Sequence, residues 1–107
     1  MAQVLPDERE LRRVIGDGEG IPDGEVEGLD ESDLIELFRS MVTLRTYDER
    51  SVVYHRQGRI GTYAIFWNHE AMQAGSVYAL ERGDWIFPSY RESAIGLLRG
   101  MPVSTVL

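Results

Sequence analysis

The fold of this chain is decided by the stretch SDLIELFRSMVTLRTYDERSVVYHR, which occupies residues 32–56. Its apolar residues recur at intervals of three and four, which is the spacing of an amphipathic α-helix. Ser32 is a good N-cap residue, and acidic side chains follow in the first turn, where they favour the helix dipole. Arginines gather towards the other end, and Gln57-Gly58 provides a stop signal. The sequence therefore predicts one long helix that ends near Arg56.

Two apolar segments follow this helix and alternate with a second helical pattern. Residues 60–67 (IGTYAIFW) are aromatic and apolar without clean alternation, so we expect an ordered loop that has room for a short strand. Helical spacing returns over residues 70–80, and Arg82-Gly83-Asp84 ends it. Trp85-Ile86-Phe87 has the aromatic and branched residues of a short buried strand, and Pro88 would end that strand.

The last part of the chain predicts two more helix starts. One helix is expected to begin near Arg91 and to stop at Gly100. Pro102 is expected near the first position of a further helix. Because the sequence ends as this helix would begin, we expect a truncated domain.

Residues 1–31 contrast with the rest of the chain in composition. Residues 1–33 hold eleven acidic residues against three arginines, whereas residues 34–107 hold seven acidic residues against eight arginines. The segment GDGEGIPDGEVEG at residues 16–28 combines glycines, acids and one proline with almost nothing to bury. We interpret residues 1–31 as an acidic, flexible N-terminal extension. Residues 32–107 then form one unit, since 107 residues are too few for two independent cores.

Charge and composition exclude several classes of function. The net charge of −7 comes with no basic stripe, so we expect no nucleic-acid partner. The chain has no cysteine, which excludes disulfides, thiolate metal sites and cysteine nucleophiles. No segment approaches the roughly 18 apolar residues of a membrane helix, and residues 1–13 lack the apolar run of a signal peptide. We therefore expect a cytoplasmic protein without a membrane partner.

Ser89-Tyr90-Arg91 is the first candidate functional group. It stands between a predicted strand and a predicted helix start, where a hydroxyl, a phenol, a guanidinium and free amides can converge on a phosphate or a carboxylate. The alternative is structural: Ser89 caps the following helix, and Arg91 pairs with Glu92 or Asp84. The local residues alone favour this structural alternative.

Tyr63 and His69 form the second candidate group. They lie in or just after the aromatic segment, where they could line a site, and a histidine there could donate a proton or orient an oxyanion. The structural alternatives are core packing for Tyr63 and a hydrogen bond to backbone for His69, and in isolation these alternatives are favoured. His55 is expected on the solvated side of the long helix. Two histidines among scattered acids show no metal-ligand spacing, so no metal site is predicted.

Several blocks, taken in order, resemble a known family. They are FRSMV at 38–42, DER at 48–50, RQGRIGTYA at 56–64, HEA at 69–71, GDW at 83–85 and FPSYRE at 87–92. Their order and spacing resemble the E1 alpha subunit of thiamine diphosphate-dependent 2-oxo acid dehydrogenases, which include the pyruvate, branched-chain and acetoin enzymes. The resemblance covers roughly residues 32–107. It implies an α/β fold, of which this chain is the N-terminal, mainly helical portion of a thiamine diphosphate-binding domain with one or two short strands.

The resemblance also assigns roles to the candidate residues. In that family the Ser-Tyr-Arg block contacts thiamine diphosphate, which implies that Arg91 holds the diphosphate and that Ser89 lines the same corner. Tyr90 would lie against both the cofactor and the substrate. Tyr63 matches an aromatic position that faces the 2-oxo acid, and His69 matches a position in the substrate-binding loop.

Three further features qualify the resemblance. Asn68 stands where glycine is usual. Ser93 occupies a position that is histidine in many pyruvate-type members, so the choice of 2-oxo acid stays open. Gly16-Asp17-Gly18 resembles the start of the family's magnesium motif but lacks the asparagines that should follow, so we expect the magnesium ligands to lie outside this chain.

The activity that the resemblance implies is decarboxylation of a 2-oxo acid on thiamine diphosphate with Mg²⁺, followed by acyl transfer to lipoyl-protein. The implied partners are an E1 beta subunit, in an alpha2-beta2 assembly, and the lipoyl-bearing E2 component. We assign no catalytic residue to this chain and expect it to be inactive alone. The alternative is a non-catalytic, partner-binding module derived from such a subunit.

Overall fold

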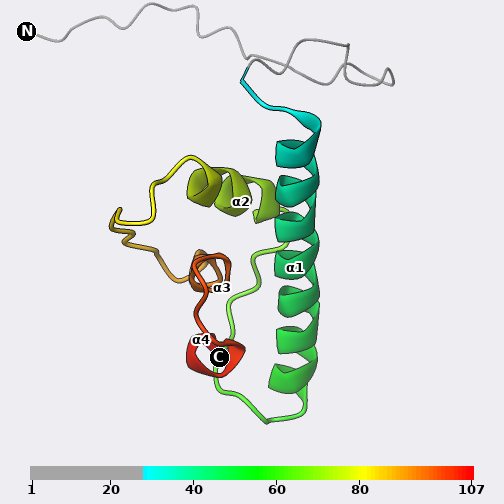
Figure 1. Ribbon diagram of the computed structural model, residues 1–107. Helices are drawn as coiled ribbons and strands as arrows, with labels where there is room; N and C mark the ends of the chain where they lie inside the picture. The colour runs from blue at the N-terminus through cyan, green and yellow to red at the C-terminus, as the bar shows by residue number, and fades with distance from the viewer. Residues whose placement is uncertain (1–27) are drawn as a thin grey trace, which may run out of the picture.

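The structure is a computed structural model that describes residues 28–107. The predicted acidic extension at residues 1–31 therefore lies outside the described residues, except for residues 28–31. Within the described part the chain is mainly helical, as predicted, and it forms helices in the order α1 (Glu31–Arg56), α2 (Glu70–Tyr78), α3 (Ile95–Leu98) and α4 (Val103–Val106) (Figure 1). No helix among these is long and apolar enough to cross a membrane.

The long helix α1 begins two residues earlier than the sequence predicts. Asp30, and not Ser32, is its N-cap, because the Asp30 carboxylate accepts a hydrogen bond from the backbone N–H of Asp33 at 2.9 Å. The Asp33 carboxylate accepts from the Asp30 N–H at 2.8 Å in return, which completes a capping box. Ser32 instead lies in the first turn and donates its hydroxyl to Asp30. At the other end, Gly58 adopts a positive φ of 69°, which ends the helix as predicted.

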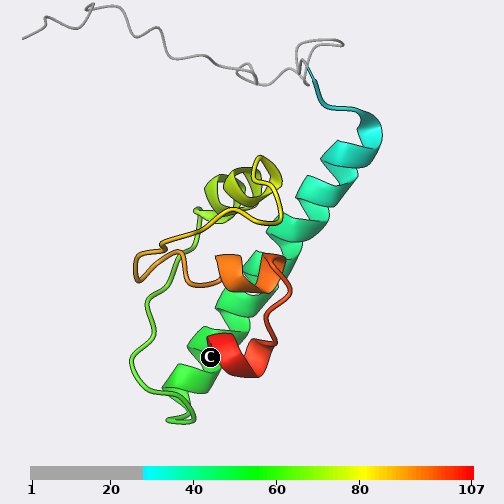
Figure 2. The same ribbon diagram turned by 60° about the vertical axis from the view of Figure 1, so that its left-hand side comes forward.

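The remaining elements lie along one side of α1. Figures 1 and 2 show α2 beside the first half of α1 and α4 near its last turns, with α3 between them. Residues 57–69 leave the end of α1 and run back along the helix to the start of α2 (Figure 1). This return places the middle of α1 next to residues that are far away in sequence.

The core is small and gathers where these segments meet. Its buried members are Leu44 and Tyr47 of α1, Phe66 of the return segment, Ala74 of α2 and Ala94. The Tyr47 ring stacks on the Phe66 ring at a centroid distance of 6.2 Å. The rings therefore fix the return segment on α1.

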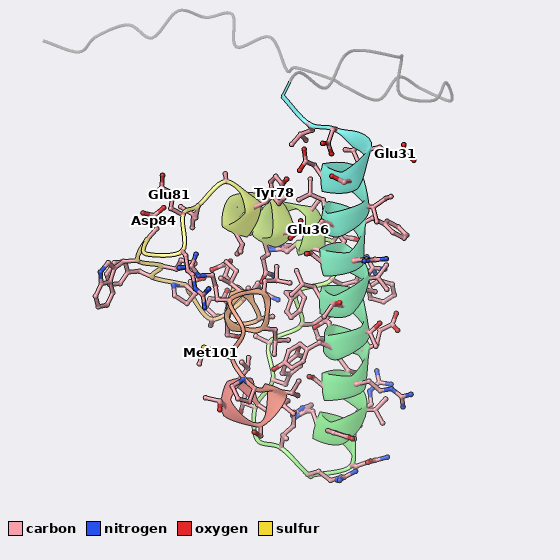
Figure 3. The ribbon with its side chains drawn as sticks, in the orientation of Figure 1. Glu31, Glu36, Tyr78, Glu81, Asp84 and Met101 are labelled. Carbon is pink, nitrogen blue, oxygen red and sulfur yellow. The ribbon has the colours of Figure 1, made fainter. Side chains whose placement is uncertain are left out.

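Polar contacts tie α2 to α1 at both of its ends. At the start of α2, the guanidinium of Arg45 forms an ion pair with the carboxylate of Glu70, which is buried. At its end, the hydroxyl of Tyr78 donates to the carboxylate of Asp33. Figure 3 shows Tyr78 on the side of α2 that faces the first turns of α1. This hydrogen bond raises the pKa of Tyr78 to about 12.

The segment between α2 and α3 corrects the strand prediction. Residues 28–107 contain no strand, and Trp85-Ile86-Phe87, which was expected to be a buried strand, is irregular. Trp85 and Phe87 are 83% and 87% exposed, and their rings stack on each other at 6.3 Å. A strand needs a neighbouring strand to satisfy its backbone groups, and the described residues offer none here. Residues 60–67 likewise form a loop without a strand, within the range of the prediction.

The helix boundaries in the last part also differ from those predicted. The α2 helix ends at Tyr78, two residues early, and the helix predicted to begin near Arg91 starts as turns before α3. The α4 helix follows Pro102, which is its N-cap, as the sequence indicates.

One arginine anchors the projecting segment that follows α2. Figure 3 shows Glu81 and Asp84 on this segment, away from α1. The guanidinium of Arg99, at the end of α3, donates to the backbone carbonyls of Glu81 at 3.0 Å, Arg82 at 2.6 Å and Asp84 at 3.1 Å. These bonds hold the entrance to residues 85–94, which carry the candidate cofactor residues.

Candidate cofactor and substrate site

Residues 89–92 form a tight turn, here called the 89–92 turn. The Glu92 carboxylate accepts hydrogen bonds from the backbone N–H of Ser89, at 2.9 Å, and from the Ser89 hydroxyl. The hydrogen bonds from Ser89 hold the pKa of the Glu92 carboxyl below its ordinary value. Ser89 does not cap the following helix as the structural alternative held, because the N-cap of α3 is Ala94. The turn fixes the backbone on which Tyr90 and Arg91 stand.

Arg91 joins this turn to the 60–69 loop, defined as residues 60–69. Its guanidinium donates to the backbone carbonyl of Ile65 and lies over the ring of Tyr90 at 5.2 Å. Its own backbone carbonyl accepts a hydrogen bond from the Gln73 side chain of α2 at 3.2 Å. Within the described residues no ion pair joins Arg91 to Glu92 or Asp84, so that part of the structural alternative is wrong.

Tyr63 and Tyr90 line one pocket, although they are far apart in sequence. The pocket has a volume of about 310 Å³, and small residues of the 60–69 loop form one of its walls. Tyr90 is 72% exposed, whereas Tyr63 is half-buried. The residues that line it are Tyr47, Ile60, Gly61, Thr62, Tyr63, Ala64, Tyr90, Ser93, Val106 and Leu107. Two of the three residues assigned to the substrate by resemblance, Tyr63 and Tyr90, therefore share a cavity of small-molecule size.

The hydroxyl of Tyr63 is held by a carboxylate of α1. Asp48 is only 2% exposed, and its Oδ1 accepts from the Tyr63 hydroxyl at 2.7 Å and from the backbone N–H of Phe66 at 3.2 Å. Burial and this bond to a carboxylate raise the pKa of the Tyr63 phenol far above its ordinary value. Tyr63 therefore stays protonated. Core packing, the structural alternative for Tyr63, is present in part, because its ring makes an edge contact with the Tyr47 ring at a centroid distance of 6.4 Å.

His69 does not line the pocket that Tyr63 and Tyr90 share, but it lies close enough to Glu92 of the 89–92 turn to interact with it electrostatically. It is the N-cap of α2, but its side chain makes no capping hydrogen bond. Its Nδ1 atom is buried, as is Oε1 of Gln73 one turn later, and neither atom has a hydrogen-bond partner among the described residues. The backbone hydrogen bond expected for the histidine side chain is absent there. Buried polar atoms of this kind are where a ligand or a water is to be expected. His55, by contrast, is exposed as predicted, with its Nδ1 at 2.7 Å from the Gly61 carbonyl.

The side chains at this corner fit an anionic cofactor. A hydroxyl, a phenol and a guanidinium stand on three consecutive residues, Ser89, Tyr90 and Arg91, and each can donate to phosphate oxygens. The unpaired Nδ1 of His69 adds a further polar atom nearby. Among residues 28–107 there is no group of three or more His, Cys, Asp or Glu side chains that could hold a metal ion.

Two contributors to this corner were missed by the sequence reasoning. Asp48 belongs to the DER block, but nothing in its neighbours indicated that a carboxylate would face the core. The signal that could have indicated Asp48 is its position next to Tyr47, on the buried face of the helix. The other acidic residues of this helix are exposed or lie in its first turn. Gln73 is fully buried and supports the backbone of Arg91, and it has no local signal of its own.

Comparison with known proteins identifies the family. The family model for the dehydrogenase E1 component matches residues 38–107. The chain belongs to the dehydrogenase E1 component family. It is 42% identical over 79 residues to the pyruvate dehydrogenase E1 component subunit alpha of Staphylococcus aureus strain Mu50, which covers 74% of this chain and 21% of that protein. It is 40% identical over 88 residues to the subunit of the same name from Staphylococcus epidermidis strain ATCC 12228, which covers 82% of this chain and 24% of that protein.

The comparisons also show how much of the length of its relatives this chain covers. The chain spans about a fifth to a quarter of the length of these relatives. The resemblance to E1 alpha subunits that the ordered blocks indicated is confirmed. No solved structure matches the chain.

Proposed function

We propose that this chain is the part of a 2-oxo acid dehydrogenase E1 alpha subunit that supplies one half of the thiamine diphosphate site. In this proposal Ser89, Tyr90 and Arg91 bind the cofactor, and Tyr63, Tyr90 and His69 face the 2-oxo acid. The observation that carries the proposal is the hydrogen bond from Arg91 to the Ile65 carbonyl. It brings the 89–92 turn and the 60–69 loop, and with them both sets of residues, to one corner of a chain that belongs to the E1 family.

Each residue has a defined task in this proposal. Arg91 exchanges the Ile65 carbonyl for a diphosphate oxygen, because a guanidinium forms stronger hydrogen bonds with a charged acceptor than with a neutral one. Ser89 donates its hydroxyl in the same corner, and the Tyr90 ring covers the cofactor. Thiamine diphosphate, when bound, supplies the chemistry that stabilises the carbanion formed on decarboxylation. This chain contributes binding and orientation, and Mg²⁺ ligands come from elsewhere in the assembly.

The pocket beside Tyr63 suits a short 2-oxo acid. Its volume of about 310 Å³ leaves room for a small side chain, and its walls combine small residues and tyrosines with the apolar Ile60, Val106 and Leu107. The relatives are named as subunits of pyruvate dehydrogenase, which makes pyruvate the first substrate to try. The proposed partners are an E1 beta subunit, in an alpha2-beta2 assembly, and the lipoyl-bearing E2 component, which accepts the acyl group.

The function is tested by following release of carbon dioxide from 1-¹³C-labelled pyruvate. An alpha subunit that carries this chain, assembled with its beta partner and supplied with thiamine diphosphate and Mg²⁺, is expected to release labelled carbon dioxide with an artificial electron acceptor. The 107-residue chain alone is expected to release none, because only half of the site is present. An assembly that decarboxylates neither pyruvate nor a branched-chain 2-oxo acid contradicts the proposal, as does turnover by the chain alone.

A further inference from the structure

We infer that Asp48 is a positioning residue, which orients Tyr63 and fixes the 60–69 loop against α1. Its effect on substrate binding rests on the proposed function, whereas its effect on the loop does not. No task was assigned to this residue by its place in the DER block. The inference follows from where its carboxylate lies and from what it accepts.

Asp48 connects α1 to the loop at two points. It is 2% exposed, and one oxygen of its carboxylate accepts both the Tyr63 hydroxyl at 2.7 Å and the Phe66 backbone N–H at 3.2 Å. These donors are 15 and 18 residues away in sequence. One buried side chain therefore fixes the loop through both a side chain and the backbone.

The surroundings of Asp48 make these two bonds costly to lose. The rings of Tyr47, Tyr63 and Phe66 pack together beside it, and no ion pair to Asp48 is present among the described residues. A buried carboxylate requires donors, because the charge has lost its contact with water. The donors available are those of the 60–69 loop, so the charge of Asp48 is satisfied only when the loop is in its observed place.

The orientation of Tyr63 is the functional consequence. With its hydroxyl held by Asp48, Tyr63 presents its ring to the pocket that it shares with Tyr90. Without the carboxylate, the phenol is free to turn its hydroxyl into the pocket, and the backbone N–H of Phe66 loses its acceptor. The wall that faces the 2-oxo acid then changes shape, while the 89–92 turn keeps the hydrogen bonds that Ser89 donates to Glu92.

Amide hydrogen exchange on the full chain tests the effect on the loop. Asp48→Ala is expected to speed exchange of the Phe66 amide by about tenfold, the equivalent of one lost hydrogen bond, and to leave the amides inside α1 unchanged. Asp48→Asn is expected to restore most of the protection, because its amide oxygen can accept both donors. Glu49→Ala, which removes the neighbouring exposed carboxylate on α1, is the matched control and should have no effect.

A second measurement keeps the test decisive if Asp48→Ala does not fold. Asp48→Asn keeps the shape of the side chain and removes its charge, so the phenol of Tyr63 should ionise at a lower pH. Absorbance at alkaline pH, taken as the difference from the same chain with Tyr63→Phe, isolates this one phenol from the other four tyrosines. An unchanged Tyr63 titration in Asp48→Asn, or unchanged Phe66 exchange in a folded Asp48→Ala chain, overturns the inference.

The effect on the substrate is measured in the alpha–beta assembly. Asp48→Ala is expected to raise KM for pyruvate about tenfold and to leave the affinity for thiamine diphosphate within about twofold. Faster loop exchange with an unchanged KM overturns the assigned role towards substrate. A wild-type assembly without activity contradicts the proposed function alone, because the exchange and titration measurements need no cofactor.

Discussion

At the scale of one residue, Asn68 adopts a backbone conformation that glycine adopts most readily. Its φ is +71°, and no other non-glycine residue in the described part of the chain has a positive φ. Asparagine is among the residues that tolerate this left-handed conformation best, after glycine. Its side chain also accepts a hydrogen bond of 3.4 Å from Arg45. Asparagine at this position is therefore compatible with the course of the backbone into α2.

Substitution of Asn68 should reveal this conformational requirement. Asn68→Ala is expected to lower the free energy of unfolding by about 1 kcal/mol, because alanine has a Cβ atom and no compensating polar group in the left-handed region. Asn68→Gly is expected to change the free energy of unfolding by less than about 0.5 kcal/mol. Glycine adopts the left-handed conformation without strain in the folded state, but it also increases the conformational entropy of the unfolded state. Urea denaturation measures both.

A glycine elsewhere in the chain provides the control for that measurement. Gly75 lies inside α2, and a Cβ atom added there meets nothing within 4 Å. Gly75→Ala should therefore stabilise the chain by about 0.5–1 kcal/mol. Equal effects of alanine at positions 68 and 75 would show that backbone conformation is not the cause.

The residues of the candidate site differ in how far the sequence could predict them. Ser89, Tyr90 and Arg91 were predicted as cofactor residues because they are adjacent and match a family block. The contact between Arg91 and the Ile65 carbonyl was not foreseen, because it depends on how the return segment lies along α1. Asp48 was missed for the same reason: a single helix pattern shows which face is apolar but not which partner a buried acid meets.

At the scale of elements, α1 was predictable and the segment before α3 was not. The periodicity and the end signal of α1 are local, and the error was a cap displaced by two residues, where Asp30 competed with Ser32. The strand expected at Trp85-Ile86-Phe87 depends on non-local pairing. Its residue types favour a strand, yet no strand among residues 28–107 is available to pair with it.

The junction between α1 and α2 depends on the ion pair between Arg45 and Glu70. The hydrogen bond from Arg45 holds the pKa of the Glu70 carboxyl below its ordinary value. Glu70 also lies in the first turn of α2, where a negative charge favours the helix dipole. The guanidinium of Arg45 further stacks over the Trp67 ring at 5.1 Å. One arginine thus holds both the end of the 60–69 loop and the start of α2.

Glu70→Gln should change how stability depends on pH. Because the folded-state pKa of Glu70 lies below the unfolded value, its contribution is fully present above about pH 4.5 and is lost as the pH falls through the folded pKa. Glu70→Gln is therefore expected to lower the free energy of unfolding at pH 7 by about 1–3 kcal/mol and to flatten its decline below pH 4.5. Urea titrations between pH 3 and pH 7 measure this.

The control for this experiment is an exposed carboxylate on α1, the other helix of this junction. Glu36→Gln on α1 should leave both the stability at pH 7 and its decline in acid close to those of the wild type. A Glu70→Gln chain with the same free energy of unfolding as the wild type at every pH would mean that the ion pair contributes nothing to folding.

At the scale of the whole molecule, the small core leaves large apolar surfaces exposed. Phe38 on α1 is 66% exposed, and Trp85 and Phe87 are more exposed still. A groove of about 610 Å³ also opens between α1 and the C-terminal segment that includes α4. Surfaces of this kind are expected of a chain that spans about a fifth to a quarter of its relatives. Family membership and the helical character could be read from the sequence, whereas these surfaces depend on how the elements pack.

The proposed role of Arg91 is to hold the diphosphate of thiamine diphosphate, and calorimetric titration of the cofactor with Mg²⁺ into the alpha–beta assembly measures this role directly. Arg91→Ala is expected to weaken binding by about 1.5–3 kcal/mol through the loss of a charge-assisted hydrogen bond. Arg91→Lys should recover only part of this, because it keeps the charge and loses the planar fork. Arg59→Ala is the matched control, since its guanidinium also stacks on a tyrosine, at 4.3 Å from the Tyr54 ring centroid. Wild-type affinity in Arg91→Ala would contradict the claim.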